Sequence, residues 1–164
     1  MSKTYKMILS SLLVSIGIFG SSVLYIPIGP LKAFPLQHAI NVISGVLFGP
    51  VYAVINAFLI SLIRNLSGTG TLLAFPGSMI GALLAGLFFY RFKTHGSAAL
   101  GEWIGTGILG SFVATLMATT LLGIHKGFFL FFSAFSLSSF IGGALGWFIV
   151  KNIKPFLHTR NTNL

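Results

Sequence analysis

Long apolar stretches alternate with short polar breaks along this chain, and their lengths are those of helices rather than strands. The longest runs have about the 20 residues that a helix needs to cross a bilayer. Two shorter runs flank Gly49-Pro50 and predict a tight membrane hairpin. The pattern therefore predicts an all-α integral membrane protein with six transmembrane helices, over residues 7–26, 36–48, 51–63, 76–90, 98–122 and 128–150.

The breaks between these runs predict three loops on one side of the membrane. Residues 27–37, PIGPLKAFPLQ, contain three prolines and cannot form a regular helix. A GTGT loop follows Arg64, and a short Gly-rich loop occupies residues 123–127. After the GTGT loop, small residues recur every four positions at Gly77, Gly81 and Ala85, which predicts a helix packed inside the bundle.

Composition supports a membrane protein and changes how the charge is interpreted. Of the 164 residues 55% are apolar and only 7% are charged, whereas a soluble domain has about 25% charged residues. We expect one transmembrane domain over residues 1–164, with a loosely ordered polar tail at about 151–164. The net charge of +9 reflects lysines and arginines between apolar runs, so it indicates topology and not nucleic-acid binding.

The distribution of these basic residues predicts that both termini are cytoplasmic. Seven lie on the side of the termini, namely Lys3, Lys6, Arg91, Lys93, Lys151, Lys154 and Arg160. Three lie on the other side, namely Lys32, Arg64 and Lys126. The first apolar run also resembles a signal peptide, but its 20 residues exceed the usual 7–15, so we interpret it as a retained helix.

Signatures of enzymes and of autonomous energy coupling are missing from the sequence. It has no GxxxxGK[ST] phosphate loop, no HExxH or GxSxG motif, no cysteine and a single acidic residue, Glu102. The four histidines stand at no metal-ligand spacing. We therefore expect no enzyme activity, no cofactor and no metal. Transport would need an external energy source, although a self-sufficient secondary carrier stays open as an alternative.

Candidate ligand contacts are the polar and aromatic side chains near the outer ends of the predicted helices. Arg64 is either an interfacial anchor or a ligand contact, and its place beside the GTGT loop favours contact. The proposed substrate-binding residues are Asn41, Arg64, Asn65, Thr71, Phe75, Thr115, Thr119, Ser133 and Ser136.

Other polar residues receive structural interpretations. We expect Glu102 to form an interfacial pair with Arg91, Lys93 or His95, on the side opposite the binding site. His38 is interpreted as a hydrogen-bonded structural residue.

Three segments resemble the substrate-binding subunits, or S components, of energy-coupling factor (ECF) vitamin transporters, and most closely the thiazole-specific branch, ThiW. The segments are KAFPLQHAINVISGVLFGP at 32–50, RNLSGTGTLLAFPGSMIGALLAG at 64–86 and ALGEWIGTGILG at 99–110.

The resemblance implies the six-helix S-component fold in a bacterial cell membrane. It implies capture of hydroxyethylthiazole, the thiazole precursor of thiamine, at the extracellular face for ATP-driven uptake. Its partners would be a transmembrane coupling protein and two cytoplasmic ATPase subunits. The family docks its coupling protein through two alanines four apart on the first helix, and the corresponding positions here are Ser11 and Ser15. Within this class, thiamine or hydroxymethylpyrimidine stays open as the substrate.

Overall fold

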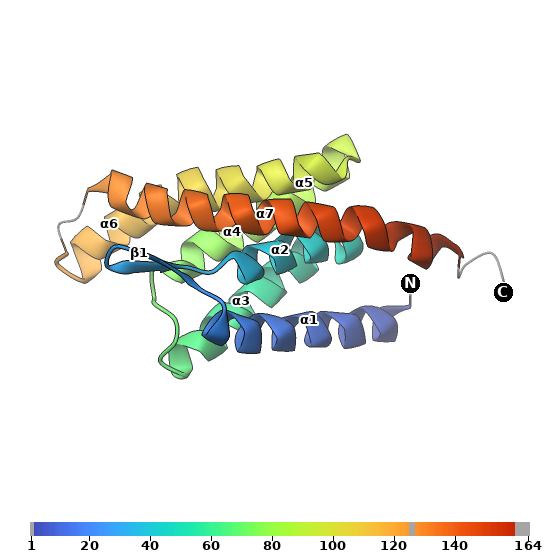
Figure 1. The fold of residues 1–164 in the computed structure, drawn as a ribbon, viewed down its shortest axis with the longest axis horizontal. Coiled ribbons are helices and arrows are strands. Elements are labelled where there is room, and N and C mark those ends of the chain that lie inside the picture. Colours follow the sequence, from blue (N-terminus) through green and yellow to red (C-terminus); the bar gives the residue numbers. More distant parts are fainter. Residues whose placement is uncertain (1, 125–126, 160–164) are drawn as a thin grey trace.

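In the computed structural model, residues 2–124 and 127–159 are described, and they form a bundle of helices with one small β-hairpin (Figure 1). In chain order the elements are α1 (Lys3–Val23), β1 (Ile26–Ile28), β2 (Leu31–Ala33), α2 (Pro35–Phe48), α3 (Pro50–Leu66), α4 (Ala74–Phe92), α5 (His95–Glu102), η1 (Trp103–Gly110), α6 (Ser111–Leu121) and α7 (Phe128–Thr159). The consecutive elements α5, η1 and α6 form one continuous helical segment, of which η1 is a π-helical section.

Each of the predicted apolar runs coincides with a helix in the described part of the chain. Four helical segments are long and apolar enough to cross a membrane, over Lys3–Ser21, Ala74–Phe92, His95–Leu121 and Phe128–Ile153. The shorter helices α2 and α3 have 14 and 17 residues. The helices are thereby confirmed, whereas the count of six membrane crossings stays a prediction.

Two segments differ from the predicted loops. Part of the Pro-rich loop forms an antiparallel hairpin, in which Ile26 pairs with Ala33 and the turn contains Gly29 at a φ of 55°. Pro27 can occupy β1 because this two-stranded hairpin leaves each strand an unpaired edge. A loosely ordered polar tail was predicted at about 151–164, but α7 continues to Thr159, because a change from apolar to polar residues does not by itself end a helix. Residues 160–164 lie outside the described residues.

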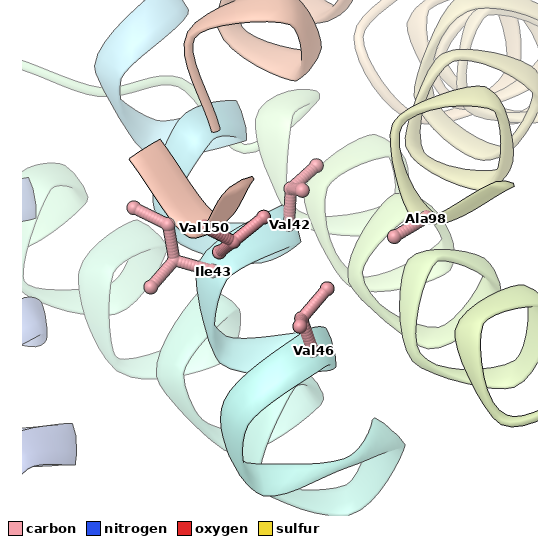
Figure 2. Packing of buried hydrophobic residues seen from close by; sticks show 5 residues of the cluster. All are labelled: Val42, Ile43, Val46, Ala98 and Val150. Carbon is pink, nitrogen blue, oxygen red and sulfur yellow. The ribbon is translucent and has the colours of Figure 1, made fainter. Parts of the chain in front are cut away.

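Helix α2 is the centre of the bundle. Twelve of its 14 residues are buried. It packs against α1, α3, α4, α5 and α7. Figure 2 shows one of its contacts, where Val42, Ile43 and Val46 of α2 meet Ala98 of α5 and Val150 of α7. Because other helices surround α2, every polar side chain on it must find its hydrogen bonds inside the protein.

Glycines bring α4 into direct backbone contact with η1, as the small-residue spacing predicted. A Cβ on Gly105 would lie 2.6 Å from the Cα of Gly81, and one on Gly110 would lie 2.5 Å from the Cα of Gly77. Gly77, Gly81 and Ala85 are all buried. The prediction that this face of α4 packs inside the bundle is confirmed.

The β-hairpin and the α3–α4 loop lie at the same end of the bundle (Figure 1). The start of α1 and the end of α7 lie at one end, and the β-hairpin and the α3–α4 loop lie at the other (Figure 1). The basic residues Lys126 and Arg160, which entered the topology prediction, lie outside the described residues. Which end faces the cytoplasm stays a prediction.

Candidate functional site

A cavity of about 390 Å³ lies among the β-hairpin, the α3–α4 loop and the helices next to them. Its wall combines the β-hairpin, the first turn of α2, the last turn of α3, the GTGT loop, the start of α4, η1 and the first part of α7. Segments far apart in the sequence therefore enclose one space. The polar residues on its wall are Ser21, Lys32, Gln37, His38, Arg64, Thr69, Thr71, Ser78, Thr106 and Ser138.

Arg64 dominates the polarity of the cavity. Although charged, its side chain is only 1% exposed. Its Nη1 donates to the Oε1 of Gln37, and its Nη2 donates to the carbonyl oxygen of Thr69 at 3.1 Å. The guanidinium carbon lies 3.7 Å from the ring centre of Phe34, a cation–π contact. The guanidinium has five N–H groups, of which these two bonds use two, whereas the buried Nε has no hydrogen-bond partner.

Gln37 links Arg64 to the interior of the bundle. Its Nε2 donates to the hydroxyls of Ser61 at 2.9 Å and Ser78 at 2.8 Å. The amide thus uses its oxygen for the cation and its nitrogen for two hydroxyl acceptors. This arrangement fixes α2 against both α3 and α4.

Glu102 lies beneath the cavity and is completely buried. Its Oε1 accepts a hydrogen bond from Asn41 Nδ2 at 3.1 Å, and lies 2.7 Å from His38 Nδ1 and 2.9 Å from Thr106 Oγ1, whose hydroxyl also contacts the carbonyl oxygen of Gly77 at 3.0 Å. Asn41 Nδ2 also donates to the carbonyl oxygen of Ser78 at 3.1 Å. Among the described residues, His38 and Glu102 form the one contact between a basic and an acidic side chain.

The expected pairing of Glu102 with Arg91, Lys93 or His95 is wrong. Glu102 lies on the buried side of α5, facing α2 and α4, where Gly81 leaves room for both carboxylate oxygens. The interpretation of His38 as a hydrogen-bonded residue is confirmed, but it also lines the cavity.

Aromatic side chains form the apolar wall of the cavity. Phe131 and Phe135 of α7 contact each other edge to face, with ring centres 6.2 Å apart. Phe34 covers the guanidinium of Arg64. At the hairpin, Lys32 lies over the ring of Tyr25 at 4.4 Å. A small planar ring can stack among such side chains while polar groups orient it.

Of the nine predicted substrate-binding residues, Arg64 and Thr71 line the cavity. Asn41 lies one layer below it, bonded to Glu102 and Ser78. Asn65 supports the GTGT loop, because its Nδ2 donates to the carbonyl oxygens of Ser61 and Thr71.

The other five predicted residues are not on the cavity wall. Phe75 contacts Phe58, with ring centres 5.9 Å apart. Ser136 accepts a hydrogen bond from the indole of Trp103 at 2.8 Å. The remaining hydroxyls bond to carbonyl oxygens of their own helices, at Thr115, Thr119 and Ser133.

The sequence held a signal for a buried polar network on α2. Gln37, His38 and Ser44, which were not proposed as ligand contacts, recur at helical spacing with Asn41 within an otherwise apolar run, and all four are buried. A polar stripe on such a helix predicts a buried network. Its partners Ser78 and Glu102 are far away in sequence, so the stripe alone could not identify them.

The predicted docking residues lie on the outer face of α1. Ser11 and Ser15 are exposed, and their hydroxyls donate to the carbonyl oxygens of Met7 and Ser11 within the helix. Because each hydroxyl is bonded internally, this face presents small residues without unpaired polar groups.

No group of three or more histidine, cysteine or acidic side chains that could hold a metal ion occurs within residues 2–124 and 127–159.

The family model of the thiamine-precursor transporter protein ThiW matches residues 7–156. No curated protein and no solved structure gives a significant match to the chain.

Proposed function

Since the chain belongs to the ThiW family of thiamine-precursor transporters, we propose that it is the substrate-binding subunit of an ECF-type transporter for hydroxyethylthiazole. It captures the thiazole at the extracellular face of a bacterial cell membrane and delivers it for ATP-driven uptake. Both termini are cytoplasmic in this proposal, so the cavity opens toward the outside.

The observation that carries the proposal is the cavity with Arg64 on its wall. A volume of about 390 Å³ is in the range of about 300–1,000 Å³ typical of small-molecule sites. Aromatic rings on the wall suit a planar heterocycle, and Arg64, which lines the cavity and can only donate, suits an acceptor atom such as a ring nitrogen.

The charges around the cavity also suit a neutral ligand. Arg64 connects through Gln37 and Ser78 to Asn41, which bonds to Glu102. The chain of hydrogen bonds thus has a basic group at one end and an acidic group at the other. A neutral thiazole leaves this balance unchanged, whereas the permanent cation of thiamine would lie near an arginine with no carboxylate within bonding distance.

Energy for uptake comes from partner subunits in this proposal. The sequence has no phosphate-binding loop. The small-residue face of α1 at Ser11 and Ser15 is exposed and allows close approach of a helix from the coupling protein. Two cytoplasmic ATPases would complete the complex.

Binding by the isolated subunit tests the proposal. The protein is purified in detergent and titrated calorimetrically with hydroxyethylthiazole, thiamine and hydroxymethylpyrimidine. We expect tight binding of the thiazole and much weaker binding of the other two. Preference for thiamine or the pyrimidine would overturn the substrate, and failure of the folded protein to bind any of them would overturn the function.

The buried His38–Glu102 pair also favours a second candidate, a self-sufficient proton-coupled carrier, because such carriers use ionisable pairs within the membrane. Liposomes that contain only this chain separate the two. Uptake driven by a proton gradient, and abolished by Glu102→Gln, would support the carrier. Uptake that requires the coupling protein, the ATPases and ATP would support the S component.

A further inference from the structure

His38 uses one ring nitrogen inside the protein and leaves the other available at the cavity. Its Nδ1 lies 2.7 Å from Glu102 Oε1. The Nε2 makes no hydrogen bond to any described residue, and it is not among the fully buried unpaired atoms. Because His38 lines the cavity, this nitrogen can be reached by a ligand.

The surrounding hydrogen bonds determine which nitrogen of His38 carries a proton. Asn41 Nδ2 donates to the carbonyl oxygen of Ser78, which can only accept, so the orientation of the amide is fixed. The same Nδ2 donates to Glu102 Oε1. When Glu102 is ionised its carboxylate has no proton to donate, so the Nδ1 of His38 is the donor toward Oε1.

A proton on Nδ1 leaves Nε2 of the neutral ring with a lone pair, so Nε2 is an acceptor. Arg64, on the same wall, can only donate. The cavity wall therefore offers a hydrogen-bond donor, Arg64, and a hydrogen-bond acceptor, His38 Nε2. A hydroxyalkyl thiazole matches both, because its ring nitrogen only accepts and its hydroxyl is its one donor.

Resting on the proposed function, we propose that His38 recognises the hydroxyl group of the substrate, and that Glu102 is the positioning residue that fixes the tautomer of His38. The hydroxyl donates to Nε2, while the ring nitrogen faces the guanidinium of Arg64. The two contacts give the substrate one orientation in the cavity and select an alcohol over the corresponding alkyl thiazole.

Two substitutions of His38 separate its two nitrogens. Asparagine places its amide near the position of Nδ1, so His38→Asn keeps a donor for Glu102 and loses the group at Nε2. Glutamine reaches to the position of Nε2, so His38→Gln keeps an acceptor for the ligand. Each variant is titrated with hydroxyethylthiazole and with the ethyl analogue that lacks the hydroxyl.

We expect the wild-type protein to bind the alcohol about tenfold more tightly than the ethyl analogue, as the loss of one hydrogen bond predicts. This ratio should fall to near one in His38→Asn and stay well above one in His38→Gln. Because it compares two ligands on the same variant, general loss of stability does not change it. An unchanged ratio in His38→Asn would overturn the role of His38.

A third ligand tests the orientation. In the hydroxyethylthiophene analogue a carbon replaces the ring nitrogen, and the hydroxyl is retained. We expect His38→Asn to weaken binding of this analogue by the same factor as binding of the thiazole. If the variant weakens the thiazole but not the thiophene, His38 binds the ring nitrogen instead, and the assignment is wrong.

Glu102 is tested through the same ratio. Glu102→Gln keeps an oxygen that accepts from Nδ1, so the preference for the alcohol should persist, whereas Glu102→Met removes the acceptor and should reduce it. Equal ratios in the two folded variants would contradict the positioning role. Wild-type protein that binds neither thiazole refutes the proposed function itself, whereas wild-type binding without a hydroxyl preference refutes only this inference.

Discussion

At the scale of single residues, Arg64 combines a positive charge, almost complete burial and an unused donor. The planar guanidinium is needed for this combination, because it bonds Gln37 and Thr69 while its face covers Phe34. A lysine ammonium offers neither the fork geometry nor the planar face.

Arg64→Lys should therefore weaken binding of the thiazole by about tenfold or more, although the charge is kept. Calorimetric titration measures the effect. The same substitution at Arg91, which is exposed in the last turn of α4 and does not line the cavity, is the matched control and should leave the affinity unchanged. Equal affinities of Arg64→Lys and wild-type protein would remove Arg64 from the site.

Two asparagines were predicted as ligand contacts, and their surroundings now predict different effects on stability. Asn41 is fully buried and holds Glu102 and Ser78, whereas Asn65 is partly exposed and bonds two loop carbonyls.

Asn41→Ala should lower the free energy of unfolding by about 1–3 kcal/mol, because buried polar partners lose their bond. Asn65→Ala should cost about 1 kcal/mol or less, because water can replace the amide. Thermal unfolding in detergent compares the two. A larger loss for Asn65→Ala would contradict the view that Asn41 belongs to the structural layer beneath the cavity.

At the scale of single residues, Arg64 and Thr71, two of the proposed ligand contacts, line one cavity, because both flank a polar loop. It placed Glu102 wrongly. Proximity along the chain suggested Arg91 and Lys93 as partners, whereas the true partners, His38 and Asn41, are more than 60 residues away. Partners so distant in sequence follow only from how the helices pack.

At the scale of elements, the close approach of α4 and η1 brings Ser78 and Glu102 toward the same polar network. It depends on glycine, since a Cβ on Gly81 would lie 2.1 Å from Thr106 Oγ1 and 2.7 Å from Glu102 Oε2. Gly96 in α5 has nothing within 4 Å of such a Cβ.

Gly81→Ala should destabilise the protein by about 1–3 kcal/mol, the usual cost of overpacking, and should also weaken ligand binding. Gly96→Ala should be neutral or stabilise by about 0.5–1 kcal/mol, since alanine favours a helix. Thermal unfolding with and without the thiazole checks both. Equal stability and equal thiazole binding of Gly81→Ala and Gly96→Ala would show that the α4–η1 contact tolerates a wider spacing.

The elements themselves were largely predictable, because long apolar runs and Gly49-Pro50 determine where helices begin and end. The central place of α2 was not, since its run was too short to suggest more than half of a hairpin. The β1–β2 hairpin was also missed, because prolines exclude a helix but do not specify strand pairing.

At the scale of the whole molecule, ligand binding and energy coupling use different surfaces. The cavity lies among the loops, whereas Ser11 and Ser15 lie on the outer face of α1. The two functions should therefore be separable by mutation.

Ser11→Leu should leave thiazole affinity unchanged but block assembly with the coupling protein, because a large side chain prevents close approach of helices. Thr120→Leu, an exposed position on α6, is the matched control and should allow assembly. Co-purification of the complex measures both. Normal assembly of Ser11→Leu would show that the coupling protein docks elsewhere.

The central claim, that this cavity holds the thiazole, is tested most directly by an experimental structure of the protein with hydroxyethylthiazole. The account predicts density for the ligand within the cavity, with its ring nitrogen near Arg64, its hydroxyl near His38, and Phe131 and Phe135 beside the ring. A ligand bound at another place, or a cavity without ligand when binding in solution is saturated, would contradict it.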